Sequence, residues 1–229
     1  MASRGDADFE PRIPKGWVMA TVDKWPINTM HNPGIRPQNW RFETAGDVKE
    51  PLSLSYDEFV KLPSVTRKLD HHCIDGWSYL GHEWTGVEMS TIVQMTMPTE
   101  GAKYIHTEGE RGYSSTFPIG QDLLLAYKRN GEAISRAGGW PVRLVAPGEF
   151  GYKSVKWVER VRFISDWEYD FWDKKLMGWG LSPIDPKLNP WNMDTKERKE
   201  GLRDLFTHLI EDQRREKIEA YRKKLDGKM

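Results

Sequence analysis

The only cysteine of the chain, Cys73, lies in the segment LDHHCIDGWS, among residues that can bind metals or transfer protons. His71 and His72 precede it directly, and Asp75 follows two residues later. Neighbouring hydrogen-bond donors and positive charges favour the thiolate, which serves as a nucleophile or as a soft metal ligand. A small residue that merely packs in the core is the plain alternative.

Zinc is one metal that this segment could bind. His71 or His72 could combine with Cys73 and His82. The spacing matches no closed tetrahedral site, however, and the chain has no second cysteine to complete one.

A metal-free hydrolase is a second interpretation of Cys73. Such an enzyme pairs the thiol with a histidine base. The candidate bases are His31, His106 and His208, and no spacing selects among them.

A second segment, GGWPVRLVAPGEFGYKSVKW, combines glycines with the basic residues Arg143, Lys153 and Lys156. Glycines let the backbone approach an anion closely, and Arg or Lys side chains complete the contact. The segment therefore predicts a phosphate or pyrophosphate site, with a hairpin that carries solvated basic residues as the alternative.

Short strands and turns surround both segments. The Ser55-x-x-Glu58 pattern is a capping box, and the Asn130-Gly131 dipeptide is typical of a two-residue hairpin turn. Helices are expected at 56–62 and 88–95. Strands are expected at 40–46, 65–69 continuing into 71–73, 102–107, the two arms of 123–134, 142–146, 154–158 and 159–164.

These elements predict an α+β fold with mainly antiparallel or mixed β-sheets. Residues 1–39 form an extended, proline-rich lead-in, and residues 40–180 the main domain. Residues 181–229 comprise a turn-rich wrapping segment and a charged C-terminal helix, which is a candidate docking element for a partner.

The composition excludes several classes of protein. Acidic and basic residues number 34 each, so net charge favours neither nucleic acid nor a membrane surface. One cysteine excludes an intrachain disulfide and any all-cysteine metal site. The start lacks a signal-peptide pattern, and no run approaches the roughly 18 apolar residues of a spanning helix. We therefore expect a cytoplasmic protein without a membrane span.

Taken together, the segments resemble the sulfite oxidase family of molybdopterin-dependent oxidoreductases over about residues 25–180. The resemblance lies in HNP, WRFETAGDVKEPLSLSYDEFVKLP, LDHHCIDGWSYLGHEWTGV, RGYSSTFP, LLLAYKRNGEAI and PVRLVAPGEFGYKSVKW. The sequence is similar to the smaller bacterial and archaeal members, which consist of the cofactor domain alone. The catalytic subunit of the periplasmic methionine-sulfoxide reductase is also similar.

The resemblance implies a sulfite oxidase-type molybdopterin-binding domain that holds one molybdenum ion on one pterin. Cys73 matches the protein thiolate that binds the metal. Tyr113 matches an active-site tyrosine, and Asp75 a position that is acidic in some relatives and could relay protons. The residues matched to cofactor binding are His31, Asn32, His72, Trp84, Arg143, Gly151, Lys153 and Lys156.

Departures from the family concern the substrate and the electron partner. Thr29, Ser78 and Lys153 stand where sulfite oxidases carry arginines that hold the sulfite dianion, so sulfite is a poor candidate. Gly138 replaces a cofactor-contacting His or Asn. No haem domain is fused to these segments, so we expect electrons to pass to or from a separate carrier or redox subunit.

The resemblance thus predicts two-electron chemistry, with oxygen-atom transfer expected, on a small-molecule substrate. One alternative is a cofactor-bearing electron-transfer subunit of a larger redox complex. The other is the cysteine hydrolase without a metal.

Overall fold

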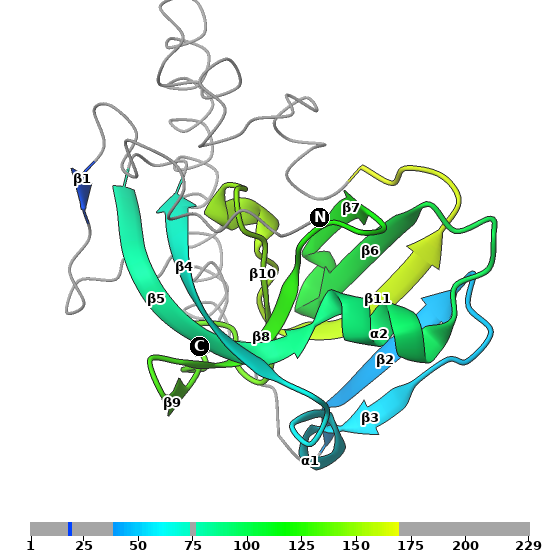
Figure 1. The fold of residues 1–229 in the computed structure, drawn as a ribbon, viewed down its shortest axis with the longest axis horizontal. Helices are drawn as coiled ribbons and strands as arrows, with labels where there is room; N and C mark the ends of the chain where they lie inside the picture. Colours follow the sequence, from blue (N-terminus) through cyan, green and yellow to red (C-terminus); the bar gives the residue numbers. More distant parts are fainter. Residues whose placement is uncertain (1–17, 20–38, 74–76, 170–229) are drawn as a thin grey trace, which may run out of the picture.

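Two β-sheets and a few short helices make up the part of the chain that the structure describes (Figure 1). The structure is a computed structural model that describes residues 18–19, 39–73 and 77–169. Its α-helices are α1 (Tyr56–Phe59) and α2 (Met89–Thr96), and its 3-10 helices are η4 (Glu110–Gly112) and η5 (Gly151–Lys153). Its strands are β1 (Val18–Met19), β2 (Arg41–Gly46), β3 (Ser53–Ser55), β4 (Val65–Cys73), β5 (Trp77–Glu88), β6 (Tyr104–Gly109), β7 (Ser114–Pro118), β8 (Leu124–Arg129), β9 (Glu132–Ala133), β10 (Arg143–Val145) and β11 (Val158–Ile164).

The first sheet, sheet A, has the strand order β1-β5-β8-β10, with β4 also paired to β5 and β9 to β8. All of its pairs are antiparallel except β1 with β5. The second sheet, sheet B, has the order β3-β2-β11-β6-β7, in which β2 and β11 run parallel and the other pairs antiparallel. Both sheets are therefore mixed.

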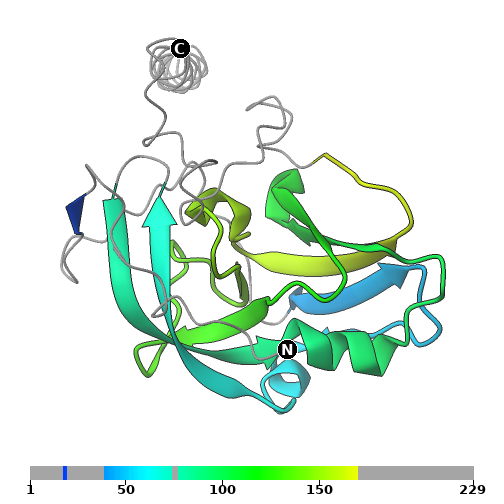
Figure 2. The same ribbon diagram turned by 45° about the horizontal axis from the view of Figure 1, so that its top comes forward.

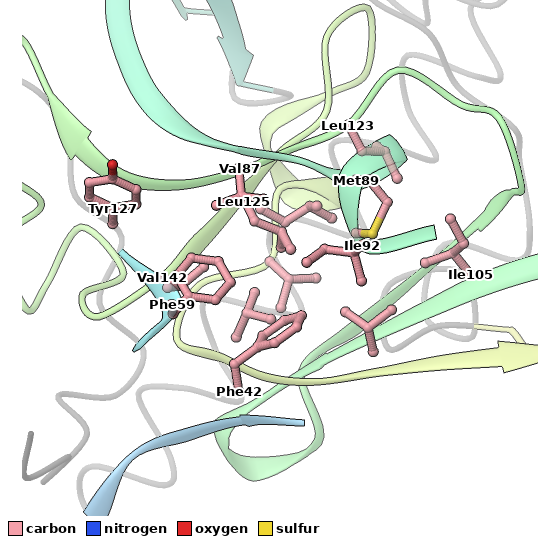
Figure 3. Close-up of a cluster of buried hydrophobic side chains, with 14 of the residues drawn as sticks. Phe42, Phe59, Val87, Met89, Ile92, Ile105, Leu123, Leu125, Tyr127 and Val142 are labelled. Atoms are coloured by element: carbon pink, nitrogen blue, oxygen red, sulfur yellow. The ribbon is translucent and has the colours of Figure 1, made fainter. Parts of the chain in front are cut away.

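The main hydrophobic core lies between the two sheets and beneath the helices (Figure 3). Phe42 comes from sheet B and Leu125 from sheet A, while Phe59 and Ile92 come from α1 and α2, and none of the four is exposed to solvent. One apolar side of each helix is buried in this way, so the core fixes the position of both helices.

Strand β8 is buried on both of its faces, which explains why its sequence is a continuous apolar run. Leu125 and Tyr127 face the core between the sheets, whereas Leu124 and Ala126 face a second cluster with Leu69 and Trp84. Because side chains alternate between the two faces of a strand, sheet A is buried on both sides at this point.

Most of the expected elements are confirmed, as are the mainly antiparallel and mixed sheets. The Ser55 capping box forms with both of its hydrogen bonds, although α1 ends at Phe59 rather than at Leu62. Asn130 and Gly131 both have positive φ, as the hairpin turn between β8 and β9 requires.

The prediction of a strand at 154–158 is wrong. Trp157 has a φ of 56°, a left-handed conformation that interrupts an extended chain, and β11 begins only at Val158. The described molecule is mostly β with few helices, so the α+β expectation overstated the helical share.

The charged C-terminal helix and nearly all of the lead-in lie outside the described residues. Within the lead-in, the two residues of β1 pair with Trp77 and Ser78 of β5. Across residues 18–19, 39–73 and 77–169, no helix combines the length and the apolar character needed to cross a bilayer.

Candidate functional site

Cys73 is the last residue of β4, and its backbone pairs with Trp77 at the start of β5. Its side chain is partly exposed, as a metal ligand or nucleophile requires. Since side chains alternate along a strand, His71 shares a face with Cys73 while His72 points to the opposite face.

The imidazole of His71 is buried against Gly151 and lies 5.8 Å from the ring of Trp77, centroid to centroid. Burial is the main cause that lowers the pKa of His71 well below its usual value, and the charges of Arg143 and Lys156 lower it further. His71 is therefore a neutral ring beside two basic side chains.

His72 connects β4 to other segments in a different way. Its Nδ1 lies 2.8 Å from the hydroxyl of Ser78 on β5, and its backbone forms an isolated parallel bridge with Phe150. Phe150 directly precedes η5, so the end of β4 and the basic segment lie side by side (Figure 2).

Arg143, on β10, is a buried cation that is only 3% exposed. Its Nη1 donates to the carbonyl of Gly138 at 3.0 Å, and its guanidinium carbon lies 5.8 Å from the ring centroid of Trp84. Its Nε has no hydrogen-bond partner, and no carboxylate of the described residues forms an ion pair with it.

The electrostatics place Arg143 near both candidate reactive groups. Burial lowers the pKa of Arg143 to about 10, while Tyr113 and Cys73 act in the opposite direction. A thiolate at Cys73 would thus be stabilised by a buried positive charge.

Lys156 and Lys153 add further positive charge to the same region. Burial lowers the pKa of Lys156 to about 7, with a contribution from Arg143, and Cys73 partly offsets this. Lys153, at the end of η5, is 8% exposed, and its Nζ lies 5.9 Å from the ring centroid of Tyr152.

Tyr113 follows η4 and reaches the basic segment. Its hydroxyl donates to the backbone carbonyl of Tyr152. A phenol that donates its proton in this way retains lone pairs that can accept a hydrogen bond from another group.

The structure therefore brings Cys73, Tyr113 and Lys156 into electrostatic range of Arg143. Trp84 packs against Arg143, and Gly151 and Lys153 come with η5 beside β4. His31, Asn32 and Asp75 lie outside the described residues.

The histidines of the zinc interpretation and of the cysteine-hydrolase interpretation have other surroundings. His82 is buried and stacked on Trp84, and burial lowers its pKa to about 3. His106 belongs to sheet B, where its Nδ1 lies 2.8 Å from the hydroxyl of Thr116. In the described part of the chain, no group of three or more His, Cys, Asp or Glu side chains is placed to hold a metal ion.

Sequence reasoning missed two contributors. From the sequence, we considered His71 only as a possible zinc ligand. Side chains alternate between the two faces of a strand, however, so His71 and Cys73, two residues apart, lie on the same face of β4. At Gly138, where the family carries a cofactor-contacting His or Asn, the backbone carbonyl accepts a hydrogen bond from Arg143. The sequence carries no signal for this second contact because the group involved is a backbone atom.

These residues fit a long anionic cofactor that binds a metal. An unpaired buried guanidinium is costly unless an anion compensates it, and the free Nε of Arg143 is a donor for such an anion. Gly151 packs against the ring of His71, which lies on the same face of β4 as Cys73. A thiolate is a suitable ligand for a soft transition metal.

Comparisons with known proteins agree with this chemistry. The model of the family described as "oxidoreductase molybdopterin binding domain" matches residues 29–172. The oxidoreductase YuiH of Bacillus subtilis is 32% identical over 139 residues, which cover 59% of this chain and 70% of YuiH. The protein-methionine-sulfoxide reductase catalytic subunit MsrP of Xanthomonas campestris is 29% identical over 196 residues, which cover 75% of this chain and 61% of MsrP.

The fold is similar to a solved structure, the sulfane dehydrogenase SoxCD from Paracoccus pantotrophus. The TM-score is 0.55 at 24% identity, and the match covers 59% of this chain and 41% of the SoxCD chain. The chain thus spans less than two thirds of MsrP and of SoxCD.

Proposed function

The chain belongs to the family of oxidoreductases with a molybdopterin-binding domain. From this membership we propose that it transfers oxygen atoms in a two-electron reaction at a metal that Cys73 would hold. The observation that carries the proposal is the buried guanidinium of Arg143, whose Nε has no hydrogen-bond partner among the described residues and which lies within electrostatic range of Cys73. A site that must hold both a metal and an anionic pterin needs a soft thiolate and buried donors close together.

Several side chains and the backbone at Gly151 would hold the cofactor, and the contacts predicted for His31, Asn32 and His72 belong to the same proposal. Cys73 would bind the metal as a thiolate, and Arg143, Lys153 and Lys156 would donate to the pterin and its phosphate. The bound molybdenum–pterin group supplies two-electron redox chemistry and an open coordination position. Trp84 keeps the guanidinium of Arg143 in place by stacking, at 5.8 Å from its ring centroid.

Tyr113 would orient the substrate rather than donate its own proton. Its hydroxyl proton is directed at the carbonyl of Tyr152, so its oxygen would act as an acceptor toward a donor on the substrate. Proton relay through Asp75 is the corresponding proposal for acid–base steps.

The substrate we propose is a small oxygen- or sulfur-containing molecule other than sulfite. Ser78, at one position where sulfite oxidases carry an arginine, is fully buried and bonded to His72. A dianion such as sulfite is held by several charged donors, and the hydroxyl of Ser78 supplies no charge.

Electrons would pass to or from a separate carrier, with the C-terminal helix as the docking element. One molybdenum ion, one pterin and no haem in this chain complete the proposal. In the alternative arrangement, the same domain is the cofactor-bearing subunit of a larger redox complex.

Substitution of Cys73 tests the proposal directly. Cys73→Ser keeps the size of the side chain but replaces the soft ligand, so we expect molybdenum content to fall by about tenfold or more. The measurement is metal analysis by mass spectrometry, together with fluorescence of the pterin released by acid. The protein is isolated from a host that makes the cofactor.

Two results would reject the proposal. One is a parent protein that contains neither molybdenum nor tungsten and no pterin. The other is a Cys73→Ser variant that keeps full metal content and full activity with artificial electron donors or acceptors.

A further inference from the structure

The ring of His71 occupies the space where Gly151 would carry a side chain. A Cβ at Gly151 would lie 2.3 Å from Nε2 and 2.6 Å from Cε1 of His71, closer than real Cβ atoms approach other atoms. Gly151 is not among the residues with positive φ. The glycine is therefore required by the His71 ring and not by its own backbone conformation.

This contact joins the two segments that make up the candidate site. On one side, His71 is two residues before Cys73 and on the same face of β4. On the other side, Gly151 opens η5, which ends at Lys153. The backbone bridge between His72 and Phe150 lies next to the contact and prevents the two segments from sliding past each other.

The ring is also held from a second direction. Trp77, the strand partner of Cys73, packs against it with 5.8 Å between the ring centroids and 32° between the planes. His71 is only 7% exposed. Its position is thus fixed by β5 and by η5 together.

We propose that His71 is a positioning residue that sets the distance between Cys73 and the basic segment 143–156, with Gly151 as its complementary partner. The inference rests on the proposed function. A cofactor that is bonded to the sulfur of Cys73 at one end and to cations of the basic segment at the other fits only one distance between the two. A displacement of about 1 Å in such a site is enough to lose most of its function.

The first test measures molybdenum and pterin content in His71→Ala, Gly151→Ala and the double variant. Each single change either removes the ring or forces it away, so each should lower content about tenfold. In the double variant the new methyl group occupies space that the ring has left, so content should recover to within about threefold of the parent.

Two control variants separate positioning from general destabilisation. Gly101→Ala adds a methyl group where the nearest atom is 3.9 Å away. His106→Ala removes a buried histidine ring from sheet B, away from β4 and η5. Both should keep the parental molybdenum content, and equal loss in His106→Ala and His71→Ala would overturn the inference.

The second test uses cofactor-free protein, in which Cys73 is the only thiol. If the ring sets the position of Cys73, the rate of alkylation by iodoacetamide should change about threefold or more in each single variant and return toward the parental rate in the double variant. Both controls should react at the parental rate.

The two tests fail in distinguishable ways. A parent without molybdenum whose variants still show the alkylation pattern would overturn the proposed function and leave the His71 contact intact. A loaded parent whose His71 and Gly151 variants match it in both measurements would overturn the inference and leave the proposed function standing.

Discussion

Arg143 is a buried cation that has no carboxylate partner among the described residues. A buried guanidinium normally pairs with a carboxylate, because its charge is costly to remove from water. Among the described residues, Arg143 instead has one carbonyl and the face of an indole ring. Its charge is therefore available to an anion that arrives from outside the protein chain.

Removal of this charge should affect cofactor binding more than folding. In Arg143→Ala we expect molybdenum and pterin content to fall at least about tenfold, because a hydrogen bond to a charged group contributes about 1.5–3 kcal/mol. Arg160→Ala is the matched control, since Arg160 is half-exposed and pairs with Glu43 on sheet B. Equal content in Arg143→Ala and the parent would show that this residue does not bind the cofactor.

Lys156 gives the cofactor-free protein a pH-dependent stability. Its pKa is about 7 in the folded chain and 10.5 as the ordinary value, so between these pH values the unfolded chain binds more protons. The free energy of unfolding should therefore rise as the pH increases from about 7 to 10. Urea unfolding across this range measures the effect.

The matched comparison isolates the contribution of Lys156. Lys156→Met should remove this part of the rise, whereas Lys61→Met, at an exposed position, should leave it unchanged. A Lys156→Met profile parallel to that of the parent would mean that Lys156 keeps its ordinary pKa in the folded protein.

Much of the residue-level site could be predicted from sequence because two of its segments are contiguous motifs. Cys73, Arg143 and Lys156 follow from residue type and from the family resemblance, and the structure brings them together. The contact between His71 and Gly151 could not be predicted, since it joins residues 80 positions apart through shape alone. The roles of His31, Asn32 and Asp75 stay predictions.

At the scale of elements, the sequence predicted a local structure correctly where residues close together in the chain form its hydrogen bonds. The capping box of α1 and the Asn130-Gly131 turn are both set by neighbouring residues, and both are confirmed. The strand expected at 154–158 failed because its alternating pattern is the same in a strand and in an irregular segment. The left-handed Trp157, whose indole donates to the carbonyl of Arg136, decides the conformation there.

The capping box should make a measurable contribution to stability. Ser55→Ala removes the acceptor of the Glu58 N–H and the hydroxyl partner of its carboxylate, and we expect a loss of about 1 kcal/mol. For a chain of this size, that loss corresponds to a fall in Tm of about 2–4 °C. Calorimetry measures it.

Ser165→Ala is the control for Ser55→Ala. Among the described residues, the hydroxyl of Ser165 bonds only to its neighbour Asp166 at the surface, so its replacement should change stability by less than about 0.5 kcal/mol. Equal effects of the two substitutions would show that the cap of α1 contributes nothing specific.

At the scale of the molecule, the site is assembled from segments that the folded sheets bring together. Cys73 comes with β4, Arg143 with β10, and Lys153 with η5, while Tyr113 follows β6 and η4. The core between sheets A and B is complete without any of these side chains except for the partial packing of Tyr113. The fold can therefore form first and bind its cofactor afterwards.

The pairing of β5 has a further consequence for motion. Strand β8 pairs with β5 from Trp84 onward. Among the described residues, the stretch of β5 that faces Cys73 therefore has β4 on one side and, at Trp77 and Ser78, only the two residues of β1 on the other. Backbone amides at 71–73 and 77–79 should exchange with deuterium sooner than those of β8 in the empty protein. Loading should slow their exchange while leaving β8 unchanged, and uniform slowing of both strands would mean that this part of the sheet opens only when the whole domain unfolds.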